Sequence, residues 1–252
     1  LTVLLLRPKW ITASPRRLAQ VRTGYLIFTL CFIGWYAQGQ LSIVNFTAAI
    51  QAVLAGRSLA FFLCGPMTVL LWAYVAVSLV LWGRGTFCGW LCPFGALQDL
   101  IASAARLLKL PQIRLHTRTD RRLKFLKYAV LAGVLAMPFF SAPWTDKAVE
   151  IEPFKTAITL VFDRSWPFVL WAVALLALSV FVYKGYCRYI CPLGAGLAVL
   201  GRVRLLNWLP RRAECGQPCQ TCRHRCEYQA IEPQGKIDYD ECFQCMDCVV
   251  IY

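Results

Sequence analysis

Four apolar segments, each close to the length that crosses a lipid bilayer, constrain this chain more than any other feature of its sequence. They cover about residues 24–44, 66–83, 125–142 and 166–183. A hydrocarbon core requires roughly 20 predominantly apolar residues in a helix. The composition agrees, because 58% of the 252 residues are hydrophobic and the mean hydropathy is +0.53. We therefore expect a mainly α-helical, polytopic membrane bundle.

The distribution of positive charge predicts how this bundle is oriented. The 27 Lys and Arg residues divide among the loops as 5 in 7–22, 9 in 84–127, 6 in 184–212, 3 in the tail, and 4 in 45–65 and 143–165 together. Cytoplasmic loops are enriched in Lys and Arg. The segments 7–22, 84–127 and 184–212 and the tail are therefore predicted to be cytoplasmic. The net charge of +14 reflects this topology. No nucleic-acid contact is predicted, because the basic residues flank apolar runs instead of forming one soluble stripe.

An internal repeat becomes visible when the cysteines are aligned. Phe87–Ala96 reads FCGWLCPFGA and Tyr186–Ala195 reads YCRYICPLGA, at an offset of 99 residues. Each copy follows an inward-running span, which predicts two duplicated hairpins at about 66–110 and 166–205. If each motif is helical, its spacing of four places the two cysteines on one face. The four candidate residues for a redox or metal relay at the membrane surface are Cys88, Cys92, Cys187 and Cys191.

The sequence does not decide whether these paired thiols bind a metal ion, ligate a cluster or act as a redox-active dithiol. A structural disulfide is disfavoured in a reducing cytoplasm, and buried thiols beside a proline are the other alternative. Two matching copies favour a functional role over chance packing. The lone thiols Cys31 and Cys64 are instead predicted to be core or lipid-facing residues.

The C-terminal tail contains a second cysteine pattern, which predicts iron–sulfur ligation. Its seven candidate metal ligands are Cys215, Cys219, Cys222, Cys226, Cys242, Cys245 and Cys248. In bacterial ferredoxins, three closely spaced cysteines bind one [4Fe-4S] cluster and the fourth cysteine of the run ligates the other cluster. By position, the last four cysteines of the tail form one complete site, and the first three begin a second. We expect a transmembrane domain at 1–212 and a ferredoxin-like domain at 213–252.

The second cluster lacks an obvious fourth ligand. The expected eighth cysteine falls at position 252, which is Tyr252. The remaining options are a non-cysteine ligand such as His224, a cysteine beyond this sequence, or an open coordination position. A zinc module is the alternative for the whole tail, although its triple-cysteine runs exceed what one tetrahedral ion needs. The apolar start, Leu1–Leu6, resembles the end of a helix, so we expect the sequence to be a fragment.

The other polar residues narrow the function further. The two histidines, His116 and His224, lie outside the spans, which excludes a membrane haem held by two histidines. No acidic residue lies within a span, which argues against a proton channel. Gln98 and Asp99 follow the first motif at the level where a quinol headgroup docks, but we expect them on a helix surface at the water line.

The duplicated motifs and the cysteine-rich tail together resemble the NosR/NapH family of membrane iron–sulfur proteins. The resemblance rests on Gly39–Asn45, Phe87–Gln98 and the seven-cysteine tail, and it extends over essentially the whole chain. It implies a multi-pass protein of the bacterial inner membrane that serves nitrous oxide respiration in denitrification. Such a protein supports the expression and activity of periplasmic nitrous oxide reductase, with electrons drawn from the quinol pool. Family members also carry FMN on an N-terminal periplasmic domain, which is not in this sequence.

The hypothesis is therefore an electron-transfer protein, with a quinol-linked oxidoreductase activity left open. One alternative is a membrane cupric reductase, like other members of the same superfamily, in which the four motif thiols bind copper. A second alternative is a redox sensor that regulates transcription, which predicts no turnover with quinol. A structural, zinc-bearing scaffold is the third.

Overall fold

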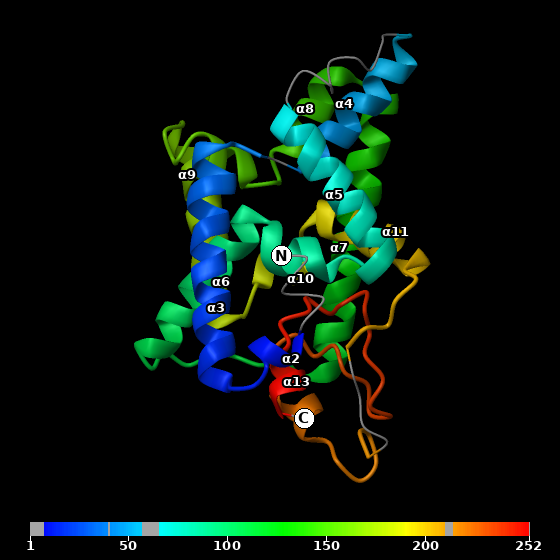
Figure 1. The fold of residues 1–252 in the computed structure, drawn as a ribbon. Coiled ribbons are helices and arrows are strands. Elements are labelled where there is room, and N and C mark those ends of the chain that lie inside the picture. Colours follow the sequence, from blue (N-terminus) through cyan, green and yellow to red (C-terminus); the bar gives the residue numbers. More distant parts are fainter. Residues whose placement is uncertain (1–7, 40, 57–65, 210–213, 252) are drawn as a thin grey trace.

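The computed structural model describes residues 8–39, 41–56, 66–209 and 214–251 (Figure 1). These residues form helices joined by irregular segments, and the tail adds two isolated β-bridges, Cys215 with Cys219 and Ile231 with Ile237. No β-strand occurs in the described part of the chain, so the prediction of a mainly α-helical fold is confirmed. Cys64, Tyr252 and the apolar start at Leu1–Leu6 lie outside the described residues.

The helices follow one another along the chain with short connections. In order they are α2 (Pro8–Ile11), α3 (Pro15–Phe28), η1 (Thr29–Tyr36), α4 (Ile43–Leu54), α5 (Pro66–Trp82), η3 (Phe87–Leu91), α6 (Pro93–Leu107), α7 (Thr117–Ala136), η4 (Met137–Phe139), α8 (Ala142–Val149), η5 (Lys155–Thr159), α9 (Trp166–Phe181), α10 (Gly185–Tyr189), α11 (Pro192–Leu200), η6 (Gly201–Val203), α12 (Thr221–Arg225) and α13 (Asp247–Ile251).

One helix in the described residues is long and apolar enough to cross a membrane. It combines α3 and η1 into 22 residues, Pro15–Tyr36, whereas the apolar helices at 43–54, 69–82, 166–181 and 192–203 are shorter. The first predicted span, 24–44, is therefore displaced toward the N-terminus. The helix starts at a proline, which suits a first helical position. It ends before Gln38, whose φ of 47° lies in the left-handed region.

The third predicted span, 125–142, is also displaced toward the N-terminus in the structure. α7 begins at Thr117 and ends at Ala136, so it extends further into the polar sequence before the span and stops earlier. Met137–Phe139 then continue as a 3-10 turn with Pro138 near its start. The polar first half of α7 is helical because several of its charged side chains are buried against the tail. Hydropathy alone does not detect a helix of this kind.

The two motif-bearing hairpins meet in the middle of the molecule, and the tail closes one end of it. α6 packs against α3, η1 and α9, while α11 packs against α7. The tail and α13 lie at the lower end in Figure 1, beside α2. Cys88, Cys187, Tyr228 and Phe243 all belong to one buried hydrophobic cluster, so the tail shares its core with the hairpins.

Two glycines allow the tail to approach the first motif closely. A Cβ on Gly89 would lie 2.0 Å from the carbonyl oxygen of Phe243, and a Cβ on Gly85 would lie 2.7 Å from that of Cys242. Gln244 fixes the same contact: its amide oxygen accepts from Thr86 at 3.0 Å, and its carbonyl accepts from the Trp90 indole at 3.0 Å. The cysteine loop of the tail is therefore in direct contact with the loop that carries Cys88.

We expect Gly89→Ala to destabilise the protein by about 3 kcal/mol, because the new methyl group would overlap the backbone of Phe243. Gly133→Ala is the matched control, since no atom lies within 4 Å of a Cβ at that helical position. The control should be neutral or stabilising by up to about 1 kcal/mol. Thermal unfolding in detergent and limited proteolysis of the tail measure the difference. Equal stability of the two variants would contradict the close docking.

Candidate iron–sulfur and thiol site

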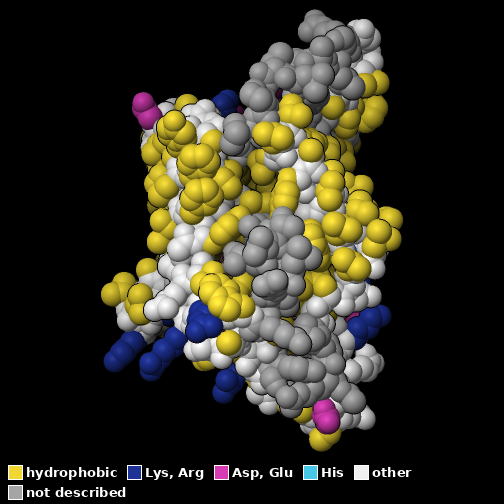
Figure 2. All heavy atoms as spheres, in the orientation of Figure 1, with side chains coloured by type: hydrophobic (Ala, Val, Ile, Leu, Met, Phe, Trp, Pro, Cys, Tyr) yellow, Lys and Arg dark blue, Asp and Glu magenta, His cyan; other side chains and the backbone are white. Residues whose placement is uncertain are grey.

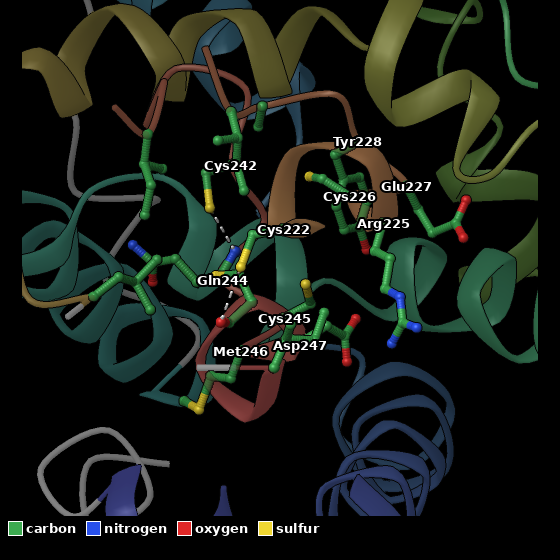
Figure 3. Close-up of a pocket in the computed structure, with 16 residues that line it drawn as sticks. Cys222, Arg225, Cys226, Glu227, Tyr228, Cys242, Gln244, Cys245, Met246 and Asp247 are labelled. Atoms are coloured by element: carbon green, nitrogen blue, oxygen red, sulfur yellow. Dashed lines mark hydrogen bonds between the residues drawn. The ribbon is translucent and has the colours of Figure 1, made fainter. Parts of the chain in front are cut away.

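Five cysteines of the tail line one internal cavity (Figure 3). They are Cys222, Cys226, Cys242, Cys245 and Cys248. Four of them are the residues that the sequence assigns to one complete cluster, and the structure brings those four together. Cys222, which the sequence assigns to the second cluster, also lies here, with its sulfur 3.7 Å from the carbonyl of Cys248. The backbone N–H of Gln244 donates to the sulfur of Cys242 at 3.3 Å.

The remaining tail cysteines lie apart from this cavity. Cys215 and Cys219 pair through a backbone bridge, and the side chain of Cys219 is exposed. His224, the candidate substitute ligand, is also exposed and lines a larger open pocket with His116 and Cys226. The described part of the tail therefore shows no fourth ligand for the predicted second cluster. Among the described residues, no three His, Cys, Asp or Glu side chains are close enough to hold a single metal ion.

A helical motif would place its two cysteines one above the other on the same helix. The structure does not show this arrangement in either C-x3-C-P motif. Cys88 lies within η3, whereas Cys92 has an extended backbone with ψ of 114° and caps the N-terminus of α6. Cys187 lies in α10, and Cys191 caps α11 in the same way. The cause is the proline after each second cysteine, because a residue before proline is excluded from the helical region.

The four motif cysteines nevertheless lie in or against one buried hydrophobic cluster. Burial raises the pKa of Cys92 and of Cys191 well above its ordinary value, and the nearby sulfurs of Cys187 and Cys88 raise it further. The second cysteine of each motif accepts an N–H from the following turn: Gly95 donates to Cys92 at 3.4 Å, and Gly194 donates to Cys191 at 3.2 Å. All four sulfurs are thus held at the junction of the two hairpins.

Charged side chains are buried in unusual number between the hairpins and the tail. The buried cations at this junction are Arg22, Arg84, Lys124, Lys127, Lys184 and Arg188, and the buried carboxylates are Asp99, Asp120 and Glu241. Each of the six cations contacts a residue of the tail, by a hydrogen bond, an ion pair or a contact with an aromatic ring. A fourth buried carboxylate, Glu152, is bound by Ser42 and Ile43 and lies near Cys191 and Tyr186 of the second motif. The junction therefore has more buried positive than negative charge.

Asp99 is the centre of the most connected part of this network. Arg22 lies 2.7 Å from its carboxylate and Lys184 lies 3.2 Å away, while the Tyr183 hydroxyl donates to its other oxygen. Its neighbour Gln98 donates to the sulfur of Cys187 at 3.4 Å. Gln98 is 0% exposed and Asp99 is 2% exposed. The prediction that both lie on a helix surface at the water line is therefore wrong, because partners from distant segments cover this face of α6.

Sequence reasoning missed the residues that join the two cysteine groups. They include Arg22, Arg84, Lys184, Tyr228 and Gln244, which come from five separate segments. One signal was available in the repeat. At the offset of 99, the docking glycines Gly85 and Gly89 correspond to Lys184 and Arg188, so the second copy has buried cations where the first copy has none.

The mainly helical fold and the match of the two hairpins to an iron–sulfur family model place the chain in the class of helical iron–sulfur proteins. The family model described as "4Fe-4S binding domain" matches residues 64–111 and 164–213, and the model described as NosR matches residues 213–252. The "Regulatory protein NosR" of Stutzerimonas stutzeri is 53% identical over the whole chain, and that of Pseudomonas aeruginosa is 49% identical. "Protein NirI" of Paracoccus denitrificans is 43% identical, again over the whole chain.

The chain belongs to the NosR/NirI family, which confirms the resemblance drawn from its motifs. It spans 35% of the length of the two NosR relatives and 37% of that of NirI. No solved structure matches the chain.

The buried Asp99 predicts a defined loss of stability in acid. Burial alone raises the pKa of Asp99, but Arg22 and Lys184 outweigh this effect and hold the pKa at about 2, below its ordinary value of 3.8. A lowered pKa stabilises the folded state above the unfolded value, here by about 2 kcal/mol, and this stabilisation is lost as the pH falls from about 4 toward 2.

Thermal unfolding between pH 7 and pH 2.5 tests this expectation. Asp99→Asn should be less stable at pH 7 by about 3 kcal/mol, because two buried cations lose their partner. It should also lose part of the acid dependence shown by the wild-type protein. Asp163→Asn, at an exposed position, serves as the control and should behave like wild type. The same acid dependence in Asp99→Asn and wild type would rule out the assignment.

Proposed function

We propose that this chain is the electron-transferring portion of a membrane-bound iron–sulfur protein. The observation that carries the proposal is the direct contact between the two cysteine groups, through Phe243 and Gln244 of the tail and Gly85 and Gly89 of the first hairpin. Redox centres exchange electrons efficiently only when they are close. The chain divides into a transmembrane domain at 1–212 and an iron–sulfur domain at 213–252.

The tail residues fit a [4Fe-4S] cluster by the chemistry of their donors. Cys226, Cys242, Cys245 and Cys248 would hold one cluster, which supplies reversible one-electron storage when bound. Burial raises the pKa of Cys242 and Cys245, and the Gln244 N–H that donates to Cys242 and the cation of Arg22 near Cys245 partly offset this effect. Cys215, Cys219 and Cys222 would begin a second cluster, whose fourth position would be a non-cysteine ligand, a cysteine beyond this sequence, or an open coordination position.

The surface supports a membrane location with several crossings. Apolar side chains cover the helices in Figure 2, and Lys and Arg gather toward the end of the molecule where the tail lies. Large exposed apolar side chains occur on three of the proposed spans, and include Phe28, Phe32, Leu70, Val77, Leu170 and Phe181. In this arrangement α5, α7 and α9 cross the membrane as α3 and η1 do, and the tail faces the cytoplasm.

The partners follow from the family. We propose that electrons pass between the quinol pool or a cytoplasmic donor and the periplasmic nitrous oxide reductase system, with FMN on a further domain of the complete protein. A second candidate function is redox sensing, since the two NosR relatives are named as regulatory proteins. Reoxidation of the reduced clusters by a quinone analogue distinguishes the two, because a sensor does not turn over with quinone.

Metal analysis and spectroscopy of anaerobically purified protein test the tail cluster. Iron and acid-labile sulfide should be present in equal amounts, and dithionite should produce the EPR signal of reduced [4Fe-4S] clusters. Cys245→Ser should lose about four irons per protein, because it removes one of the four ligands of a complete cluster. Cys31→Ser is the control, since Cys31 is exposed on η1 and belongs to neither cysteine group. Zinc in place of iron would refute the electron-transfer function.

Reporter insertions test the proposed orientation. Alkaline phosphatase, which is active only outside the cytoplasm, should be active when inserted after Asp163 and inactive when inserted after Lys109. A fluorescent protein that folds in the cytoplasm should show the opposite pattern. The reason is the charge asymmetry, because 9 Lys and Arg residues lie within 84–127 but 3 within 143–165. Equal phosphatase activity at both positions would be inconsistent with the multi-pass topology.

A further inference from the structure

Each copy of the repeat ends in an exposed apolar segment. The first post-motif segment, residues 104–113, covers the last turn of α6 and the residues after it. The second post-motif segment, residues 199–206, covers the end of α11, η6 and the residues that follow. Leu107 in the first segment is 85% exposed and Val203 in the second is 73% exposed. The two segments lie on opposite flanks of the molecule, at the ends of α6 and α11 (Figure 1).

Hydrogen bonds place both segments at the ends of proposed spans. The N–H of Ile113 donates to the carbonyl of Phe181, the last residue of α9, at 2.7 Å. The N–H of Leu205 donates to the carbonyl of Val80, in the last turn of α5, at 2.8 Å. Each copy therefore binds the end of the inward-running helix of the other copy. In the proposed topology α5 and α9 end at the cytoplasmic face, so the exposed side chains of both segments lie at that level.

These hydrogen bonds are of the kind that a helix end requires near lipid. The last carbonyls of a helix have no partner within it and need water or another donor. An unsatisfied carbonyl is costly at the depth of the hydrocarbon, where water is absent. Backbone N–H groups bind such carbonyls at the ends of both α5 and α9. Segments of this kind fit the boundary between the acyl chains and the headgroups.

Positive charge accompanies the exposed apolar side chains in both segments. Arg106 and Lys109 belong to the first segment, Arg202 and Arg204 belong to the second, and neither segment contains an acidic residue. Arg202 pairs with Asp240 at 2.8 Å, whereas the other three cations form no ion pair in the described part of the chain. Apolar side chains lie just above Lys and Arg on both flanks of the lower half of the molecule (Figure 2). This pattern is typical of segments that bind an anionic membrane surface.

We propose that the two post-motif segments are membrane-surface anchors, which bind anionic phospholipids of the cytoplasmic leaflet. The apolar side chains enter the acyl-chain region, and Arg106, Lys109 and Arg204 bind the lipid phosphates. At the repeat offset of 99, Leu107 corresponds to Leu206, and both are exposed, so both copies keep the pattern. The proposal goes beyond electron transfer, but it rests on the proposed topology for the position of the ends of α5 and α9.

The anchors have a consequence for the cysteine motifs. Cys92 caps the start of α6 and Cys191 caps the start of α11, and each of these helices leads directly into an anchor. A lipid-bound anchor on each flank therefore holds both motifs, and the tail docked on them, at a fixed depth below the cytoplasmic surface.

Lipid titration of the full-length protein tests the recognition of charge. Native mass spectrometry counts the phospholipid bound when phosphatidylglycerol or phosphatidylcholine is added in detergent. Wild type should prefer phosphatidylglycerol, and Arg106→Gln/Lys109→Gln should lower the apparent affinity for this lipid by about fivefold for each charge removed. Lys147→Gln/Lys155→Gln, at two exposed positions of the opposite loop, is the matched control and should bind like wild type. Equal affinity in wild type and Arg106→Gln/Lys109→Gln overturns the proposal.

Photo-crosslinking in the membranes of the producing cells tests the depth of the anchors. A benzophenone amino acid is placed at position 108, 205 or 170, one position at a time. Leu108 and Leu205 are exposed in the two anchors, and Leu170 is exposed on the proposed span α9. Illumination should attach phospholipid at all three positions. The exposed position of Arg118, near the start of α7, is the control for a site in water and should give no lipid adduct.

The outcomes separate the anchors from the proposed topology. Lipid adducts at position 170 but not at positions 108 and 205 overturn the anchors and leave the multi-pass topology standing. Adducts that join position 108 or 205 to a protein, including a second copy of this chain, also overturn them. A lack of lipid adducts at position 170 refutes the topology and, with it, the anchors.

Discussion

The contact between the tail backbone and the first hairpin is the constraint on which the rest of this structure depends. The carbonyl of Phe243 occupies the space that a side chain at position 89 would fill, and the Cys242–Gln244 segment does the same at position 85. Only glycine at both positions permits this approach. The contact buries Phe243 completely, brings Gln244 to Trp82, Thr86 and Trp90, and places the tail cysteines beside the hairpin cysteines.

This contact also explains why so many charges are buried. Once the tail covers the hairpins, the basic residues of α3, α7 and the segment before α10 can no longer reach water. They are retained because each finds a partner on the tail, such as Tyr228 for Arg22 and Glu241 for Lys127. Six buried cations exceed the four buried carboxylates, Asp99, Asp120, Glu152 and Glu241, and buried charge without a counter-ion is strongly destabilising.

The two copies of the repeat place their cysteines in the same way, but the residues around those cysteines differ. Both copies end a short helical turn with a cysteine that caps the next helix, as the shared Cys-Pro dipeptide requires. The first copy has Gly85 and Gly89, which admit the tail, and the second has Lys184 and Arg188, which bind it. Gene duplication thus provides two sulfur-bearing loops, and a few substitutions convert one into a docking surface and the other into its electrostatic partner.

The sequence by itself determined the helical class, the repeat and the family, because hydropathy, spacing and duplication are local properties of the chain. It did not predict the burial of Gln98 and Asp99, the helix break inside each motif, or the limits of the first and third predicted spans. Those features depend on contacts between segments as far apart as Arg22 and Tyr228, or Trp82 and Gln244. Only tertiary structure decides them, because a polar residue on an amphipathic helix is buried or solvated according to which distant side chain is available to bind it.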